Sequence, residues 1–470
     1  MKRIGILLPD GVGIRNYMFS SFLKNLMLSE KVEIVLIHSV TEMAISEIEN
    51  HNKFKFEKHL LPLQKESFKL RFYREFISYA RLMFNKNLTN NDSIMTNWNP
   101  QKNKISKKIF YFLIESLQYL FIKNYNSILF FENTYNRAVL KESKSYKKFL
   151  KEIKVDVIFC TNQRANNSIL FIAEANNMGI KTIGAVFSWD NIPKANLSLK
   201  TDEYVVWSEH MKEEMNLFYP EIPEDKIKIT GTPQFEFYEN PDLLQSKTEF
   251  CKQFGLDSSK KTICFSGDDT RTSPYDPIYL SDLAEKISNL PKSNQPQILL
   301  RRCPVDLSGR FDSIVEKYKD IIKVAAPIWN FDRNNKKKWT LVYPKFEDVE
   351  LLINTVKHCD VVLNVGSTMA HDFAMFKKPA IYINYDVSNA KNWSVNTIYQ
   401  FQHFRSMEYL EPVFWLNSKD MILEILNKAF ASNENSKQIK DGQKWLDIIA
   451  TDRENASENI ANALIGIHHE

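Results

Sequence analysis

Short runs of apolar residues alternate with helical patterns along almost the whole chain. In the first half, Arg3–Leu8 is a compact apolar run, Asn16–Leu28 carries the periodicity of a helix, and Val32–Ser39 is a second apolar run. Continuous apolar runs are typical of strands in a parallel sheet that helices cover on both faces. The pattern returns in four further runs: Val155–Thr161, Lys181–Phe187, Glu203–Trp207 and Lys226–Thr230. The first half therefore predicts a doubly wound sheet.

The alternation stops in a polar stretch, Pro233–Ser246, and then restarts. Five more runs have strand character: Thr262–Ser266, Gln297–Arg301, Lys323–Ala326, Asp360–Val365 and Ala380–Tyr385. Two successive arrays predict an α/β protein with two Rossmann-like doubly wound domains facing a cleft. We place the parts as follows: an N-terminal domain at 1–235 with a helical insertion at about 65–125, a C-terminal domain at 246–435, and a C-terminal helix at 436–470 that packs back across both domains.

Composition and charge narrow the class further. The chain has 470 residues, of which 44% are hydrophobic and 25% charged, which excludes a largely disordered, collagen-like or coiled-coil protein. A net charge of +5 over this length gives no argument for nucleic acid binding. The five cysteines include no CxxC pair and indicate reduced thiols in a cytosolic protein.

No apolar stretch of the sequence predicts a signal peptide or a membrane span. The apolar run at the N-terminus is shorter than a secretory core segment. The longest apolar stretch, Ile109–Ile122, is interrupted by Glu115 and Gln118 and falls short of the ~20 residues that a spanning helix needs. We expect a cytoplasmic protein.

The region between the first two apolar runs and the third is unusual. Residues 85–104 are rich in Asn and Lys and predict a loop, flanked by a basic aromatic helix at Lys65–Phe84 and an aromatic helix at Ile105–Ile122. One interpretation is a helical hairpin with a solvated basic face. The other is an interfacial surface on the inner membrane face, where basic residues meet anionic lipid: Lys69, Arg71, Arg74 and Arg81.

The loop after the first strand, Pro9–Arg15, is the first candidate site. Ligands of open α/β sheets bind at the carboxyl ends of strands. Gly11 and Gly13 permit close backbone approach, Asp10 is placed to act as a base, and Arg15 is a candidate for acceptor binding. The two glycines do not complete a GxGxxG motif, so a plain tight turn is the alternative interpretation.

The second candidate follows the strand that ends at Phe187. Trp189, Asp190, Asn191 and Lys194 bring an indole, a carboxylate, an amide and an ammonium group to one strand end. Carbohydrate sites use an aromatic face for stacking and polar groups to orient hydroxyls. The alternative is a loop in which Asp190 or Asn191 caps the next turn.

The third candidate is an anion site after the strand Asp360–Val365. Gly366, Ser367 and Thr368 form a small-residue turn that opens a helix, a combination that holds a diphosphate. Asp372 lies one helical turn further on, where a ribose diol would bind. The alternative is a capping turn followed by a surface Asp.

Two arginines at neighbouring strand ends are candidates for phosphate binding. Arg271 follows the first strand of the second array and Arg302 follows the next. A guanidinium matches phosphate geometry, although an ordinary surface ion pair explains either residue as well. The sequence contains no HxxxH, HExxH or DxD motif, so we predict neither a metal site nor a cofactor.

Three segments resemble glycosyltransferases of the two-Rossmann-domain kind, called GT-B. The segment Val365–Ile381 is similar to the GT-B donor segment, with a small-residue turn, an acid, a small residue and Lys-Pro. Lys228–Phe235 resembles the strand that ends the first domain in such enzymes and in CDP-glycerol glycerophosphotransferases. Ser188–Asn191 is similar to a stretch of bacterial surface-polysaccharide transferases.

The chain departs from these families at three positions. Asp372 stands where the families use Glu on the nucleotide ribose. Asn364 replaces the first carboxylate of the E-x7-E pair of many retaining members, which argues against that group. Cys303-Pro304 replaces the HP that some members carry after the second donor-domain strand.

The resemblance implies a metal-independent glycosyltransferase of surface polysaccharide synthesis. A nucleotide-sugar would be the donor and a glycan or lipid-linked glycan the acceptor. If configuration inverts, a carboxylate must take the acceptor proton, and Asp190 is preferred over Asp10 for its polar company. The alternatives are a glycerol- or ribitol-phosphate transferase, an enzyme like UDP-GlcNAc 2-epimerase, and a non-catalytic carbohydrate-binding partner protein.

Overall fold

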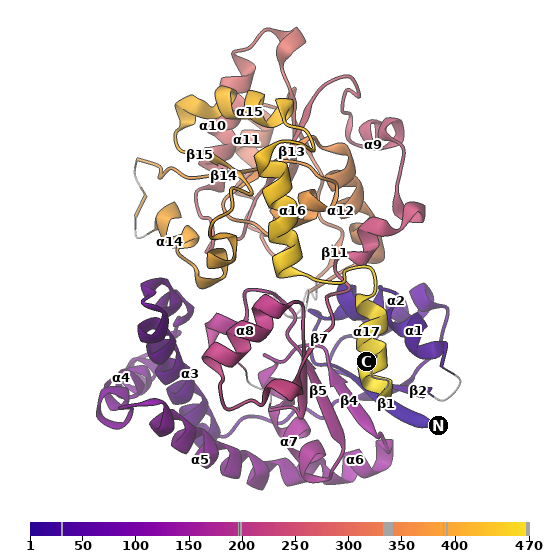
Figure 1. Ribbon diagram of the computed structural model, residues 1–470, viewed down its shortest axis with the longest axis vertical. Coiled ribbons are helices and arrows are strands. Elements are labelled where there is room, and N and C mark those ends of the chain that lie inside the picture. The colour runs from indigo at the N-terminus through magenta and orange to yellow at the C-terminus, as the bar shows by residue number, and fades with distance from the viewer. Residues whose placement is uncertain are drawn as a thin grey trace. The chain divides into compact units, whose positions relative to one another are not determined.

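The computed structural model describes residues 1–470 except 30–31, 196, 198–199, 332–341, 389, 392 and 467–470. The chain divides into two compact units (Figure 1). The N-terminal unit comprises Met1–Pro233, Phe401–His403 and Thr451–Glu470. The C-terminal unit comprises Gln234–Gln400 and Phe404–Ala450.

The N-terminal unit is built on a seven-stranded parallel sheet with the order β3-β2-β1-β4-β5-β6-β7. Its strands are β1 (Lys2–Leu8), β2 (Val32–His38), β3 (Glu57–Leu60), β4 (Val157–Cys160), β5 (Lys181–Ala185), β6 (Glu203–Val206) and β7 (Ile227–Ile229). The central strands are buried because helices cover both faces. The strand β3 lies at the edge of the sheet, consists mostly of polar residues and was not among the predicted strands.

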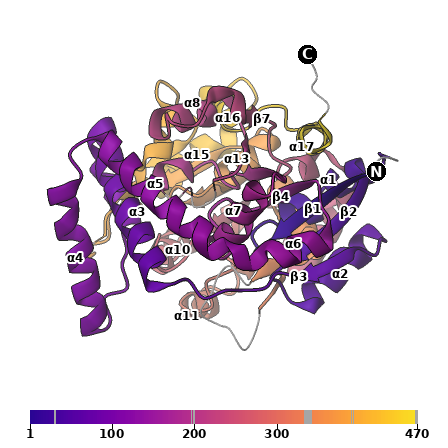
Figure 2. The same cartoon turned by 90° about the horizontal axis from the view of Figure 1, so that it is seen from below.

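Helices and one π-helical turn connect and cover these strands (Figures 1 and 2). They are η1 (Ile14–Met18, the π-helical turn), α1 (Phe22–Met27), α2 (Glu42–Asn52), α3 (Phe68–Thr89), α4 (Ile105–Phe121), α5 (Tyr125–Ser143), α6 (Lys147–Ile153), α7 (Ile169–Asn177), α8 (Glu209–Phe218) and α17 (Ala456–Ile465). The predicted helix at Asn16–Leu28 is thus two short pieces. The predicted loop at 85–104 is partly helical, because α3 continues to Thr89 and a 3-10 helix, η2 (Asp92–Asn97), follows.

Of the four basic residues expected on the surface of α3, Arg81 is buried, Arg71 and Arg74 are half-buried and Lys69 is exposed. Arg81 is 3% exposed; its guanidinium pairs with Glu132 of α5 and, at 2.6 Å, with Glu221. Arg74 pairs with Glu66 at 2.8 Å and with Glu75 at 3.2 Å. The interpretation that Arg74 and Arg81 meet lipid is therefore wrong: both charges are neutralised inside the unit.

The C-terminal unit contains a six-stranded parallel sheet with the order β10-β9-β8-β13-β14-β15. Its strands are β8 (Thr262–Ser266), β9 (Gln297–Arg301), β10 (Ile322–Val324), β13 (Val361–Asn364), β14 (Ala380–Ile383) and β15 (Phe414–Leu416), beside an antiparallel pair, β11 (Trp329–Asn330) and β12 (Tyr343–Pro344). The helices are α9 (Lys247–Phe254), α10 (Asp276–Ser288), α11 (Asp312–Lys317), α12 (Phe346–His358), α13 (Met369–Met375), α14 (Val395–Tyr399), α15 (Ile422–Ala431) and α16 (Lys437–Ile449). The predicted α/β class with two Rossmann-like sheets is confirmed.

The C-terminal segment forms two helices rather than one. In the C-terminal unit, α16 packs on α13, with the Trp445 ring 4.2 Å from the ring of His371. In the N-terminal unit, α17 packs on α1, where Ser457 Oγ lies 3.3 Å from Ser20 Oγ. Among the helices of the described residues, none is long and apolar enough to cross a membrane.

Candidate functional site

In the N-terminal unit, three adjacent strands end beside one another and carry the polar loops that the sequence singled out. The sheet order places β4 between β1 and β5. Asp10 follows β1, Asn162 follows β4 and Asp190 follows β5. Because the strands are parallel, all three loops lie at the same carboxyl edge.

Asp10 is a buried carboxylate held by two hydrogen bonds. Its Oδ1 accepts from the Val12 amide at 3.1 Å and its Oδ2 from Asn162 Nδ2 at 2.8 Å. The side chain is 6% exposed. Burial raises the pKa of Asp10 to about 6, against the two hydrogen bonds, which lower it. A carboxylate with this pKa is suited to accept a proton near neutral pH.

The loop after Asp10 packs tightly on the loop after β4. A Cβ atom on Gly13 would lie 2.5 Å from Thr161 Cβ, so only glycine fits there. Thr161 is itself fixed, because its hydroxyl donates to the Leu7 carbonyl at 3.1 Å. Arg15 lies in η1, where its Nε donates to Asn16 Oδ1 at 3.0 Å. Gly13 therefore serves packing, and the acceptor role of Arg15 stays a prediction.

Asp190 is surrounded by its own loop. Its Oδ1 accepts from Ser188 Oγ at 2.7 Å and from Asn191 Nδ2 at 2.8 Å, and its Oδ2 pairs with the Lys194 ammonium. Burial opposes ionisation, but Lys194, His403 and the hydrogen bond from Ser188 together outweigh it and hold the pKa of Asp190 well below its usual range. A carboxylate that binds protons so weakly is a poor general base.

Trp189 and its neighbours give the loop a structural role as well. The Trp189 side chain is 2% exposed and Asn191 is 3% exposed. Lys194 lies in a 3-10 helix, η5 (Ile192–Lys194), and its ammonium group forms an ion pair with Asp190. The alternative of a self-bonded loop accounts for these contacts, and acceptor binding by Trp189, Asn191 and Lys194 stays a prediction.

Glu214 is a buried carboxyl group that was not among the predicted site residues. It lies on α8, is 5% exposed, and among the described residues neither carboxyl oxygen has a hydrogen-bond partner. The imidazole Nε2 of His210 lies 3.9 Å from Glu214 Oε1. Burial, with the charge of Asp190, raises the pKa of Glu214 to about 8. The sequence could have indicated this burial, because Glu214 lies on the apolar face of its helix together with Met211 and Met215.

In the C-terminal unit, the turn after β13 has a left-handed backbone conformation that favours glycine. Gly366 has φ +66°, and a Cβ there would lie 3.0 Å from Phe404 Cζ. The Ser367 amide donates to Asn364 Oδ1 at 2.9 Å, and the Ser367 carbonyl accepts from Tyr382 at 3.0 Å. Thr368 is exposed at the start of α13. The backbone amide of Ser367 is thus already hydrogen-bonded within the turn, whereas Thr368 is exposed to solvent.

Asp372 is buried rather than open to a ribose. It is 4% exposed, and its Oδ1 accepts from the Tyr238 hydroxyl at 2.8 Å. Tyr238 lies on a 3-10 helix, η7 (Glu236–Glu239), in the stretch that the sequence marked only as polar. This hydrogen bond connects the stretch to α13. Binding of a ribose by Asp372 stays a prediction, and it would require the carboxylate to accept hydrogen bonds from both Tyr238 and the ribose.

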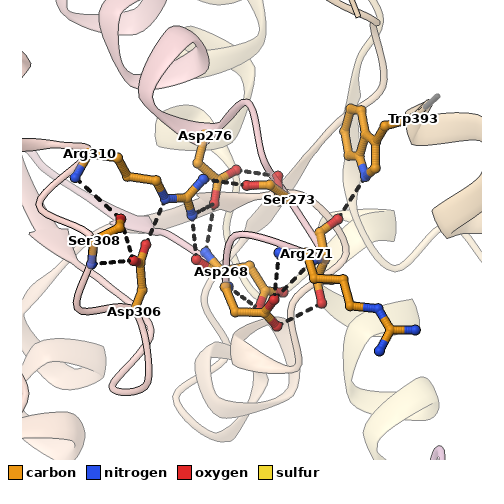
Figure 3. A network of polar contacts seen from close by, with 10 residues as sticks. Asp268, Arg271, Ser273, Asp276, Asp306, Ser308, Arg310 and Trp393 are labelled. Atoms are coloured by element: carbon orange, nitrogen blue, oxygen red, sulfur yellow. Dashed lines mark hydrogen bonds and ion pairs between the residues drawn. The ribbon is translucent and has the colours of Figure 1, made fainter. Parts of the chain in front are cut away.

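The loop after β8 is braced by an arginine that sequence analysis did not single out (Figure 3). Arg310 donates to the Asp268 carbonyl at 2.6 Å, to the Ser273 carbonyl at 2.7 Å and to Asp306 Oδ2 at 2.6 Å. The Asp268 amide donates to Asp276 Oδ2 at 2.6 Å. Burial raises the pKa of Asp268 to about 7 and that of Asp276 to about 6.

The two predicted phosphate-binding arginines lie on this edge of the sheet. Arg271 is exposed, and its guanidinium points away from the Asp268–Arg310 network (Figure 3). Arg302 is half-buried, with its Nη1 3.9 Å from Asp312 Oδ1. Since β9, β8 and β13 are neighbours, the loops of Arg302, Arg271 and Gly366 share one carboxyl edge.

Comparison with known proteins gives fold-level relatives. No protein-family model and no curated protein sequence matches the chain. Among solved structures, MnaA of S. aureus, in a structure with UDP, is 10% identical with TM-score 0.55, covering 100% of this chain and 98% of that one. A putative UDP-N-acetylglucosamine 2-epimerase from Listeria monocytogenes is 9% identical with TM-score 0.52, covering 98% and 96%. A glycosyltransferase from Rickettsia africae ESF-5 is 12% identical with TM-score 0.51, covering 99% and 98%.

These likenesses extend over nearly the whole of each chain, and at about 10% identity they concern the fold. They match the two Rossmann-like sheets found in the two units. The protein therefore has the GT-B fold that its sequence motifs predicted.

Proposed function

We propose that the protein is a glycosyltransferase that moves a sugar from a nucleotide-activated donor to a glycan or lipid-linked glycan acceptor in surface polysaccharide synthesis. The observation that carries the proposal is the buried Asp10 carboxylate, whose pKa of about 6 suits a general base. The fold, shared with a glycosyltransferase, with a putative UDP-N-acetylglucosamine 2-epimerase and with a protein solved with UDP, supports an enzyme acting on a nucleotide-sugar.

In the proposed mechanism, Asp10 takes the proton from the acceptor hydroxyl as that oxygen attacks the anomeric carbon. Asn162 holds Asp10 in place through the hydrogen bond at 2.8 Å. We prefer Asp10 to Asp190, because Lys194 keeps Asp190 ionised and occupied. Asp190 would instead maintain the loop that carries Trp189, Asn191 and Lys194, our candidates for acceptor binding together with Arg15.

The donor would bind at the carboxyl edge of the C-terminal sheet. The exposed Arg271 and the half-buried Arg302 would neutralise charge that builds on the departing phosphate, which is the chief electrostatic demand of the reaction. Gly366, Ser367 and Thr368 would approach the phosphates, and Asp372 would share its carboxylate with the ribose. We propose that the reaction needs no metal, because arginines and a turn can supply this stabilisation.

A UDP-GlcNAc 2-epimerase-like enzyme is the second candidate, favoured by the structural likeness to a putative member from Listeria monocytogenes. Such an enzyme would return a nucleotide-sugar in which the configuration at one sugar carbon has changed. The fate of the sugar without any acceptor therefore separates the two candidates.

A thermal-shift panel of UDP, GDP, dTDP, CDP, CMP and ADP without added metal tests the donor site. A nucleotide at ~100 times its Kd stabilises by about 2.7 kcal/mol, which raises the melting temperature of a domain of this size by about 5–11 °C. We expect one clear hit, which weakens about tenfold in Arg271→Ala and stays unchanged in Arg137→Ala, an exposed arginine of α5. A response to no nucleotide, or equal loss in both variants, would contradict the proposal.

A further inference from the structure

We propose that the outer face of α4 is a membrane-docking surface that binds anionic lipid. This outer α4 face consists of six apolar side chains: Ile105, Ile109, Phe112, Leu113, Tyr119 and Leu120. Their exposed fractions are 77%, 56%, 64%, 46%, 68% and 66%. A contiguous apolar surface of this kind on a folded protein marks an interaction site.

The six residues share one side of the helix. Their spacing of three, four and seven positions brings them onto one stripe at about 100° per residue. The opposite side is buried, with Ile114 at 0% and Tyr111 at 5% exposed. There α4 packs on α3, and Tyr111 contacts Trp98, with ring centroids 5.7 Å apart. The helix is therefore apolar on both sides, and only one side is needed for the fold.

The position of α4 within its unit leaves the outer face available. Both views show α4 at the edge of the N-terminal unit, with α3 between it and the sheet (Figures 1 and 2). The pairing of α3 with α5 secures the inner part of this layer. Extra apolar residues on α4 thus add no internal packing, which leaves an external partner as their physical explanation.

The charges around the face select the partner. Residues 102–123 contain five lysines and one acid, Glu115. Glu115 is neutralised by Lys102 at 2.8 Å. Lys104 stands at the first turn, Lys108 on the flank and Lys123 just beyond the last turn, and all three are exposed. An apolar stripe bordered by lysines matches the interface of an anionic bilayer, where lysines meet headgroups and apolar side chains enter the acyl region.

A second copy of the chain fits the face less well. Interfaces between protein subunits are depleted in Lys relative to the rest of the surface. The 17 residues of α4 extend about 26 Å at 1.5 Å per residue, which suits a helix lying in the plane of the bilayer surface. We therefore assign the face to lipid.

The test is flotation of the full chain with liposomes of phosphatidylcholine, with and without about 30 mol% phosphatidylglycerol. We expect flotation with the anionic liposomes that falls at least tenfold with the neutral ones and at high salt. The variant Ile109→Ser/Phe112→Ser/Leu113→Ser should lose flotation at least tenfold. A matched variant at exposed apolar residues of the C-terminal unit, Leu307→Ser/Tyr409→Ser, should float like the wild type.

A charge variant separates the two parts of the surface. Lys104→Glu/Lys108→Glu should remove the preference for anionic liposomes, whereas Lys148→Glu, on an exposed lysine of α6, should keep it. Equal flotation of the triple-serine variant and the wild type would overturn the proposal. So would a wild-type dimer that the triple-serine variant converts to a monomer without any lipid binding.

The outcome is independent of the proposed function. Lipid binding by α4 needs neither Asp10 nor the donor loops. Flotation without sugar transfer would support the lipid-binding surface and count against the transferase. Sugar transfer without flotation would support the transferase and count against the lipid-binding surface.

Discussion

The amide of Asn162 donates a hydrogen bond of 2.8 Å to the carboxylate of Asp10, joining the loops that follow β4 and β1. The bond fixes the carboxylate at the carboxyl edge of the N-terminal sheet. It also lowers the pKa of Asp10 against the larger effect of burial, so that the value stays at about 6. One amide thus both positions the proposed base and tunes its basicity.

Replacing the base should stop the chemistry and spare donor binding. Asp10→Asn keeps the shape and an acceptor oxygen but cannot take a proton, so kcat should fall about 10²–10⁴-fold. Nucleotide affinity in the thermal-shift assay should be unchanged. Asp225→Asn, at a carboxylate 75% exposed, serves as the control. Wild-type turnover in Asp10→Asn would exclude Asp10 as the base.

The pH dependence should report the same carboxylate. A base works in its ionised form, so kcat/KM should rise as pH increases through about 6, the pKa of Asp10. Asn162→Ala removes a hydrogen bond to the ionised form and should move this limb to higher pH. Rate profiles from about pH 5 to 8 measure it. An acidic limb that stays in place in Asn162→Ala would separate it from Asp10.

Asp190 should matter more for stability than for chemistry. Asp190→Asn leaves Lys194 without its partner, and with side chains 24% and 25% exposed we expect a loss of about 1–3 kcal/mol in the free energy of unfolding. Asp190→Asn/Lys194→Met should recover part of this loss. Urea unfolding gives the values. A fully stable but inactive Asp190→Asn enzyme would instead restore Asp190 as the base.

The turn at Gly366 offers a comparison between two glycines of the same unit. Gly366 and Gly255 both have positive φ, +66° and +64°, so alanine costs about 1–2 kcal/mol at either position through backbone strain. At Gly366 the new Cβ also meets Phe404 at 3.0 Å, whereas nothing lies within 4 Å at Gly255. Gly366→Ala should therefore be the less stable variant and should alone lose nucleotide affinity. Equal behaviour of the two variants in melting and binding would argue against a donor role for this turn.

The carboxyl pair beside Arg310 should make the C-terminal unit less stable as pH rises. Asp268 and Asp276 have folded-state pKa values of about 7 and 6, above the ordinary value of 3.8. Between these values the folded state binds more protons than the unfolded state, so the free energy of unfolding falls as pH increases from about 4 to 7. Asp268→Asn should flatten this slope in denaturant titrations, while Asp225→Asn should not. A slope unchanged in Asp268→Asn would refute the assignment.

The sheets could be predicted because their strands are apolar at nearly every position, as in Val361–Asn364. The edge strand β3 (Glu57–Leu60) was missed because an edge strand can be polar. The prediction of a loop at 85–104 was partly wrong for another reason. The helix α3 continues through Asn and Lys residues to Thr89. Asn is a weak helix former, and tertiary packing of α3 overrides that preference.

Site residues were harder to predict than strands, because their roles depend on partners far away in sequence. The sequence indicated a surface charge at Arg81, but in the structure this residue is buried and pairs with Glu132 and Glu221. Asp372 was predicted to bind a ribose, but its carboxylate accepts a hydrogen bond from the Tyr238 hydroxyl. Sequence spacing identifies which strand end a residue follows, but not which side chain from another element reaches it.

The most direct measurement is the fate of a labelled sugar. Purified protein is incubated with the nucleotide-sugar whose nucleotide gives the thermal-shift hit, with and without a lipid or glycan acceptor fraction. We predict that the label leaves the nucleotide and joins the acceptor in the wild type, and that Asp10→Asn abolishes this transfer. A label that stays on the nucleotide in the presence of acceptor, unchanged or as an epimer, would contradict the glycosyltransferase assignment.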